Sequence, residues 1–189
     1  MTPAETAALV RAAPPKLGRT RLVLVDGPSA SGKTMFAALL ARELAAPGAD
    51  AAGPVETVHT DDLLDGWDDQ FTYWPRLRRQ VLTPLRHGAP GGYHPFDWQL
   101  GRFGTEWVTV WPADVVIVEG VGAARAEARP WASLSVYVHA PAALRRARSI
   151  LRDGPGMQGV LRVWRHREQI HFAADATAAQ ADLRVDGSG

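Results

Sequence analysis

The chain has 189 residues, a formal net charge of +1 and no cysteine. Hydrophobic residues make up 46% of it and charged residues 22%, which is typical of a globular protein with one buried core. The near-neutral charge argues against nucleic acid or an anionic membrane as a partner, and the lack of cysteine excludes disulfides and cysteine nucleophiles. No apolar run is long enough to span a membrane and no signal-peptide layout is found, so we expect a single cytoplasmic domain over residues 1–189.

The predicted elements alternate between helices and strands. A helix is expected within residues 1–15, where Thr2 and Glu5 have the spacing of a capping box and two prolines follow. Short strands rich in valine and leucine are predicted at 20–25, 55–60, 114–119, 134–139 and 182–186, with helices at 33–46, 73–87, 141–153 and 157–173. Glycine and proline predict loops at 46–54 and 87–95. This alternation predicts an α/β fold, a three-layer αβα sandwich around a mostly parallel sheet of about five strands.

A glycine-rich segment joins the first strand to the next helix and matches the pattern G-x-x-x-x-G-K-[ST]. It consists of Gly27, Pro28, Ser29, Ala30, Ser31, Gly32, Lys33 and Thr34. In such a loop, backbone N–H groups converge on phosphate oxygens and the following helix adds its N-terminal dipole. Lys33 would reach the β- and γ-phosphates, Thr34 would hold Mg²⁺, and Met35 would complete the nucleotide contacts. A Gly/Ser turn with a chance lysine is the alternative, but the strand before and the helix after favour a site for ATP and Mg²⁺.

Two acidic segments follow strands whose carboxyl ends should meet near this loop. Asp61 and Asp62 come directly after the second strand, and either could act as the base for an attacking hydroxyl or help to place Mg²⁺. Capping of a helix that begins at Leu63 is the alternative for both, and only one of the two neighbours is expected to face the site. Glu119 ends the third strand after four apolar residues. This is the position expected of an acid that orders the water shell of Mg²⁺. The sequence therefore predicts Thr34, Asp61 and Glu119 around the metal.

Arginines are concentrated at 145–152 and 162–167. On a helix, Arg145, Arg148 and Arg152 would share one face, where guanidinium groups could bind a transferring phosphoryl group. We expect Arg145 to contact the nucleotide, and Arg148 and Arg152 to act in catalysis with Lys33 and Asp61. The alternative is an ordinary solvated helix face.

With these motifs placed, the chain resembles the uridine/cytidine kinase family, within the group of phosphoribulokinase and bacterial pantothenate kinase. "GPSASGKT" looks like that group's form of the phosphate loop, and "TDDLL" stands where the family carries D-S-F-Y or D-D-F-Y. "VTVWPADVVIVEG" is similar to the strand pair that leads to its E-G, and "LRRARSILRDG" resembles its arginine-rich lid. "ADLRVDG" resembles its closing strand, so the similarity runs from about residue 20 to 187.

The resemblance implies a P-loop kinase with a lid at about 141–173 and Asp61 as the base. "PFDW" looks like the family's Y-D-F segment, which helps to hold the nucleoside. This segment matches Phe96, Asp97 and Trp98, and we also expect Asp62, Tyr93 and Arg102 to contact the acceptor. The sequence departs from the family at Leu64, where the family has an aromatic residue, and at residues 99–102, where its H-S-R is absent. In the family these side chains contact base and ribose, so the departures concern the acceptor and leave the phosphate chemistry intact.

The expected activity is transfer of the γ-phosphoryl group of ATP to a hydroxyl of a small molecule, with a nucleoside as the first choice. A sugar acid, a vitamin precursor or an antibiotic hydroxyl on the same frame is one alternative. A nucleotide-dependent binding module that signals to a partner is another, although a switch needs neither the acid at Asp61 nor an arginine lid. The sequence is also compatible with a homo-oligomer.

Overall fold

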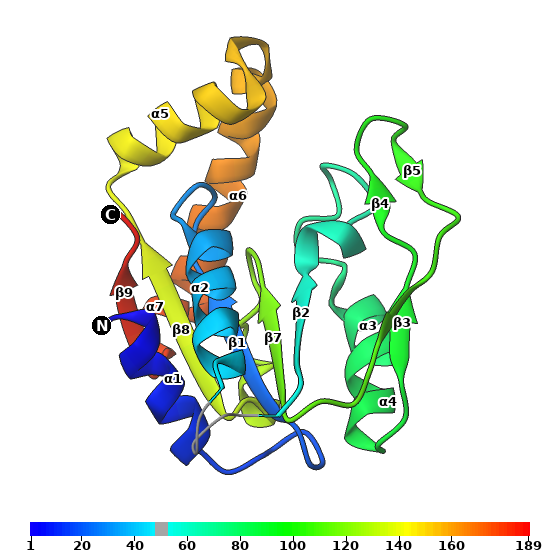
Figure 1. Cartoon of the computed structure of the whole chain (residues 1–189). Coiled ribbons are helices and arrows are strands. Elements are labelled where there is room, and N and C mark those ends of the chain that lie inside the picture. The colour runs from blue at the N-terminus through cyan, green and yellow to red at the C-terminus, as the bar shows by residue number, and fades with distance from the viewer. Residues whose placement is uncertain (48–52) are drawn as a thin grey trace.

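The computed structural model describes residues 1–47 and 53–189. Residues 48–52, in the segment predicted as a loop at 46–54, lie outside the described residues. Figure 1 shows a central sheet with helices on both sides and two groups of elements that rise beyond one end of it. One group is α5 (Ala142–Asp153) with α6 (Gln158–Asp175), and the other is β4 (Phe96–Asp97) with β5 (Arg102–Phe103).

The central sheet has five strands and is parallel throughout. Its members are β1 (Arg21–Asp26), β2 (Val55–His59), β7 (Val115–Glu119), β8 (Leu134–His139) and β9 (Leu183–Asp186), in the order β2-β7-β1-β8-β9. Each pairs with its neighbour in parallel register, for example Val25 with Glu119 and Asp26 with Tyr137. All five strand predictions are therefore confirmed to within one residue at each end. The carboxyl ends of β1, β2 and β7 lie together, which places the predicted loop and acids at one edge.

One face of the sheet is covered by α1 (Pro3–Ala12) and α2 (Lys33–Ala45). Thr2 caps α1 as predicted, since its hydroxyl accepts from the Glu5 amide at 3.2 Å and the Glu5 carboxylate accepts from the Thr2 amide at 2.8 Å. The side chains of Val23 and Val25 point to this face, where they join a buried cluster with Leu40. The two faces of β1 are thus both buried, as its unbroken apolar sequence predicts.

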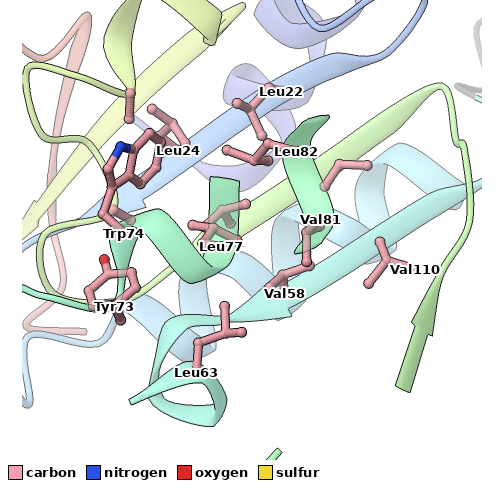
Figure 2. Close-up of a cluster of buried hydrophobic side chains, with 14 of the residues drawn as sticks. Leu22, Leu24, Val58, Leu63, Tyr73, Trp74, Leu77, Val81, Leu82 and Val110 are labelled. Carbon is pink, nitrogen blue, oxygen red and sulfur yellow. The ribbon is translucent and has the colours of Figure 1, made fainter. Parts of the chain in front are cut away.

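The alternate residues of β1, Leu22 and Leu24, belong to a second buried cluster on the other face (Figure 2). Its cover comes from the helical segment that contains α3 (Trp74–Leu77) and α4 (Thr83–Arg86), together with Trp164 of α6. The remaining helices are α5 (Ala142–Asp153), α6 (Gln158–Asp175) and α7 (Thr177–Gln180), and α5 and α6 confirm the helices predicted at 141–153 and 157–173.

The helix predicted at 73–87 is present but is not a uniform α-helix. A π-helical turn over Arg78–Leu82 separates α3 from α4, and the Thr83 amide donates to the Arg78 carbonyl five residues earlier. Pro84 has no N–H to offer the Gln80 carbonyl, so an α-helical ladder would break there in any case. The prediction of one regular helix missed this adjustment.

Four short strands were not predicted as sheet elements. The segment at 87–95, expected to be a loop, contains β3 (Gly91–Tyr93), which pairs with β6 (Val108–Val110). Next to it, β4 (Phe96–Asp97) pairs with β5 (Arg102–Phe103). Strands of two or three residues are too short for an alternating pattern to show in the sequence.

Within the described residues, none of the helices is both long enough and apolar enough to cross a membrane.

Candidate active site

The glycine-rich segment forms a tight loop between β1 and α2. Gly27 has a φ of 142° and Gly32 a φ of 98°, values that favour glycine. A Cβ at Gly27 would collide with the Val138 carbonyl oxygen, so β8 lies directly behind the loop. Ala30 also has a positive φ, 61°, and the turn it makes brings the loop back toward the start of α2.

The amides of this loop form a concave set at the N-terminus of α2. Ser31 donates to the Pro28 carbonyl at 3.2 Å, and Ser29 donates to Glu168 at 2.9 Å. In the described part of the chain, the amides of Ala30, Gly32, Lys33 and Thr34 donate to no protein acceptor. Such groups at a helix N-terminus suit an anion, so the loop fits the phosphates of a nucleotide.

Asp26, which sequence reasoning missed, connects this loop to the segment after β7. Its buried carboxylate accepts the Gly27 amide at 2.6 Å, the Gly122 amide at 2.9 Å and the Ala124 amide at 2.8 Å. Burial nevertheless raises the pKa of Asp26 to about 6, against the opposite effect of these hydrogen bonds. The signal in the sequence that could have identified Asp26 is its position immediately before Gly27.

Thr34 and Glu119 lie side by side at the floor of the site. The Thr34 hydroxyl donates to Glu119 Oε1 at 3.1 Å, and His59 Nδ1 lies 2.7 Å from the same oxygen. This hydrogen bond with Glu119 raises the pKa of His59. Within the described residues, no cluster of three or more acidic, histidine or cysteine side chains could hold a metal by itself. A hydroxyl beside one carboxylate fits Mg²⁺, which keeps several waters and binds partly through phosphate oxygens.

Asp61, in a 3₁₀ turn over Thr60–Leu63 that follows β2, lines the same cleft as Lys33, Thr34 and Glu119. It is open to solvent on the cleft side, but the protein packed around it raises its pKa by desolvation, and the neighbouring Lys33 ammonium opposes that rise. Asp62 instead lies beside Tyr93, whose hydroxyl is 3.3 Å from Asp62 Oδ2, and it does not line the cleft. Burial raises the pKa of Asp62 as well. Of the two neighbours, Asp61 is therefore the one that the structure places in the cleft.

The predicted lid arginines lie on α5, where Arg148 and Arg152 line the cleft, and all three are engaged with protein groups. Arg148 donates to the Gly187 carbonyl at 2.7 Å and to the Ser188 carbonyl at 3.2 Å. Arg152 forms a bidentate pair with Asp153, at 2.8 and 2.9 Å. Arg145 donates to the Ala140 carbonyl at 3.1 Å and does not line the cleft. To contact a phosphoryl group, the three arginines would have to give up these hydrogen bonds to the protein.

Aromatic side chains form one wall of the cleft. The rings of Trp67 and Trp98 meet edge to face at a centroid distance of 5.0 Å, and Trp67 meets Trp164 in the same way at 5.5 Å. Leu64 and Leu161 line the same side. The sequence singled out Trp98, whereas Trp67 and Trp164 belonged to a set of tryptophans expected in the core or the cleft wall, with nothing to separate the two.

The other predicted acceptor residues are near this wall but outside the cleft lining. Phe96 is buried behind Trp98, at a centroid distance of 5.1 Å. The Asp97 carboxylate accepts the Gln99 and Leu100 amides, both at 2.9 Å, and so shapes the β4–β5 turn. Arg102 is exposed on β5. The structure thus brings Trp98 to the site and leaves Asp97 and Arg102 beside it.

The cleft as a whole has a volume of about 1180 Å³, enough for a nucleotide and a small acceptor together. Of the predicted site residues it is lined by Ser29, Ala30, Gly32, Lys33, Thr34, Met35, Asp61, Trp98, Glu119, Arg148 and Arg152. Gly27, Pro28 and Ser31 belong to the loop beneath this surface.

Comparison with known proteins supports the same reading of the fold. No protein-family model matches the chain. A curated uridine kinase from Staphylococcus carnosus is 27% identical, over 92% of this chain and 90% of its own length. A solved candidate fructose transport system kinase from Silicibacter sp. TM1040 aligns with a TM-score of 0.67 at 24% identity, over 97% of this chain and 98% of that one. A possible uridine kinase from Bacillus stearothermophilus aligns with a TM-score of 0.63 at 20% identity, over 88% and 89%.

These comparisons confirm two predictions. The chain has the αβα fold of P-loop kinases, with five parallel strands and flanking helices. The resemblance to uridine kinases found in the motifs is also present along most of the chain.

Proposed function

We propose that this protein is a kinase that transfers the γ-phosphoryl group of ATP to a hydroxyl of a small molecule, with a nucleoside as the preferred acceptor. The observation that carries the proposal is the placement of Asp61 in one cleft with Lys33, Thr34 and Glu119, which an aromatic wall also lines. A carboxylate beside a phosphate loop is what a hydroxyl acceptor needs, and a binding module does not need it.

Each residue has a role in this proposal. The amides of residues 30–34 and the Lys33 ammonium hold the phosphates. Thr34 holds Mg²⁺ through its hydroxyl, and Glu119 holds it through the water shell of the metal. When bound, Mg²⁺ neutralises charge on the phosphates. Asp61 orients the acceptor hydroxyl and accepts its proton, while Arg148 and Arg152 supply positive charge from α5.

The acceptor class follows from the wall made by Leu64, Trp67, Trp98 and Leu161. Flat aromatic and apolar surfaces suit a planar ring more than a small polyanion. Any nucleobase can stack on an aromatic side chain. The likeness to uridine kinases supports a nucleoside, and the likeness to a candidate fructose transport system kinase supports a sugar as the second choice.

An acceptor panel with γ-³²P-labelled ATP tests the proposal. Uridine, cytidine, fructose and glycerate would be compared in the wild type and in Lys33→Ala, which removes the ammonium from the loop. We expect label on a nucleoside at a rate that Lys33→Ala reduces by about 10²-fold or more. ATP binding without transfer to any acceptor would favour a nucleotide-dependent binding module instead.

A further inference from the structure

Glu168 is a buried acid that the roles above leave out. It lies on α6, which follows the arginine-rich α5, and its exposed fraction is 1%. Burying a carboxylate is costly unless it is paired and hydrogen-bonded, so its partners indicate what it does.

The partners of Glu168 are on the phosphate loop and on its own helix. Its Oε1 accepts the Ser29 amide at 2.9 Å and the Trp164 indole N–H at 2.8 Å, and it also accepts the Ser29 hydroxyl. Trp164 Nε1 lies 2.7 Å from the Ser29 hydroxyl oxygen, which closes the group. The other carboxylate oxygen, Oε2, is 4.0 Å from Arg145 Nη1.

This arrangement connects α6 with the phosphate loop across a large separation in sequence. Ser29 is the third residue of the loop, and the amides that converge on the anion site begin with the next residue, Ala30. Glu168 Oε1 accepts both the amide and the hydroxyl of Ser29, so it holds this residue at two points. The position of Ser29 in turn sets where the Ala30 turn begins.

A negative charge beside an anion site repels phosphate, and that cost needs an explanation. Arg145 offsets part of it from the Oε2 side. The members of this buried network satisfy one another's hydrogen bonds, and another arrangement would leave some of them without partners. The network therefore favours a single arrangement. The same contacts connect the loop to the helix pair that carries Arg148 and Arg152.

We propose that Glu168 is a positioning residue for nucleotide binding, which holds Ser29 so that the loop amides from Ala30 onward converge on the phosphates. The inference rests on the proposed function, because it concerns the site for ATP. It assigns Glu168 no contact with the nucleotide.

Two substitutions separate the hydrogen bonds of Glu168 from its charge. Because all the hydrogen bonds fall on Oε1, Glu168→Gln can keep them, whereas Glu168→Ala removes them. We expect Glu168→Ala to raise the KM for ATP about tenfold with a much smaller change in kcat, and Glu168→Gln to stay within about threefold of the wild type. Glu127→Ala, which removes an exposed acid of the same charge, is the control and should leave the KM unchanged.

A readout without nucleotide keeps the two proposals distinguishable. Hydrogen exchange of the peptide that contains residues 27–34 should be faster in Glu168→Ala than in Glu168→Gln or the wild type. If the wild type transfers no phosphate while this difference is found, the proposed function fails and the contact between Glu168 and Ser29 stands.

The outcomes that overturn the inference are specific. A wild-type KM for ATP in folded Glu168→Ala overturns it, and so does an equal rise in Glu168→Gln, because charge alone would then be responsible. If Glu168→Ala does not fold, Ser29→Ala replaces it, since it removes the hydroxyl contact and keeps the amide. We expect about a threefold rise in the KM for ATP in Ser29→Ala, and a wild-type value there contradicts the inference.

Discussion

The two sides of the cleft are built differently. On the proposed nucleotide side, the loop is held from behind by Asp26 and from α6 by Glu168, through hydrogen bonds of 2.6 to 2.9 Å to backbone amides. On the proposed acceptor side, Trp67 and Trp98 meet through ring contacts, and the β4–β5 pair behind them has two residues in each strand. One side is a network of directional polar contacts and the other is an apolar wall on a short hairpin.

The difference indicates which part of the site allows variation. Backbone amides that are to receive phosphate must be placed within a few tenths of an ångström, and here buried carboxylates fix the neighbouring loop residues Gly27 and Ser29. An aromatic wall recognises shape and area, and it tolerates a change of ring. We therefore expect substitutions on the nucleotide side to affect activity or stability strongly, and substitutions on the acceptor side to affect mainly the KM for the acceptor.

The largest effect should come from Asp61→Asn, at the border between the two sides. Loss of a positioned base is expected to lower kcat by about 10²- to 10⁴-fold, with little change in the melting temperature. Asp62→Asn is the matched comparison, because Asp62 lies beside Tyr93 and outside the cleft lining, and its loss should be far smaller. Steady-state kinetics of both purified variants would check this, and a normal turnover in Asp61→Asn would reject the assigned base.

The polar network on the nucleotide side predicts an unusual pH dependence of stability. Folding raises the pKa of Asp26 from 3.8 to about 6, so the folded state penalises the carboxylate form. The free energy of unfolding from this group is therefore highest below pH 4 and falls as the pH rises to about 6, by up to about 3 kcal/mol.

Asp26→Asn removes this titration. Denaturant unfolding at pH 4.5 and pH 7.5 should show that the variant is less destabilised, relative to the wild type, at the higher pH. The opposite trend would mean that the three amide hydrogen bonds outweigh burial and that the folded-state pKa of Asp26 is lowered.

The smallest of these effects is expected on the acceptor side. Trp98→Ala removes part of the aromatic wall and should raise the KM for a nucleoside about tenfold, with the KM for ATP nearly unchanged. Trp111→Ala, which removes an exposed tryptophan away from the cleft, is the control. An equal effect of both variants, or a change confined to the KM for ATP, would argue against the wall as the acceptor site.

The sequence predicted for a physical reason that Lys33, Thr34, Asp61 and Glu119 would meet in one cleft. These residues are contiguous or end neighbouring strands: Lys33 and Thr34 follow the loop, and Asp61 and Glu119 follow β2 and β7. In a parallel sheet, strand ends converge, so position in the chain predicts position in space.

The acceptor side and the support for the loop were predicted less well. Glu168 contacts Ser29 across 139 residues and is an isolated acid in a helix rich in arginine, so no local pattern marks it. Trp67 and Trp164 have nothing in the sequence that distinguishes a cleft wall from a core. Asp97, predicted from a motif, holds its own turn, since an aspartate also accepts backbone amides two and three residues on in such a turn.

The most direct test of the account is a crystal structure with a non-hydrolysable ATP analogue, Mg²⁺ and uridine. The account predicts phosphates on the amides of residues 30–34, the metal at Thr34, the base against Trp98, and a ribose hydroxyl within hydrogen-bond distance of Asp61. A nucleotide bound away from this loop, or a hydroxyl that leaves Asp61 without contact, would contradict it.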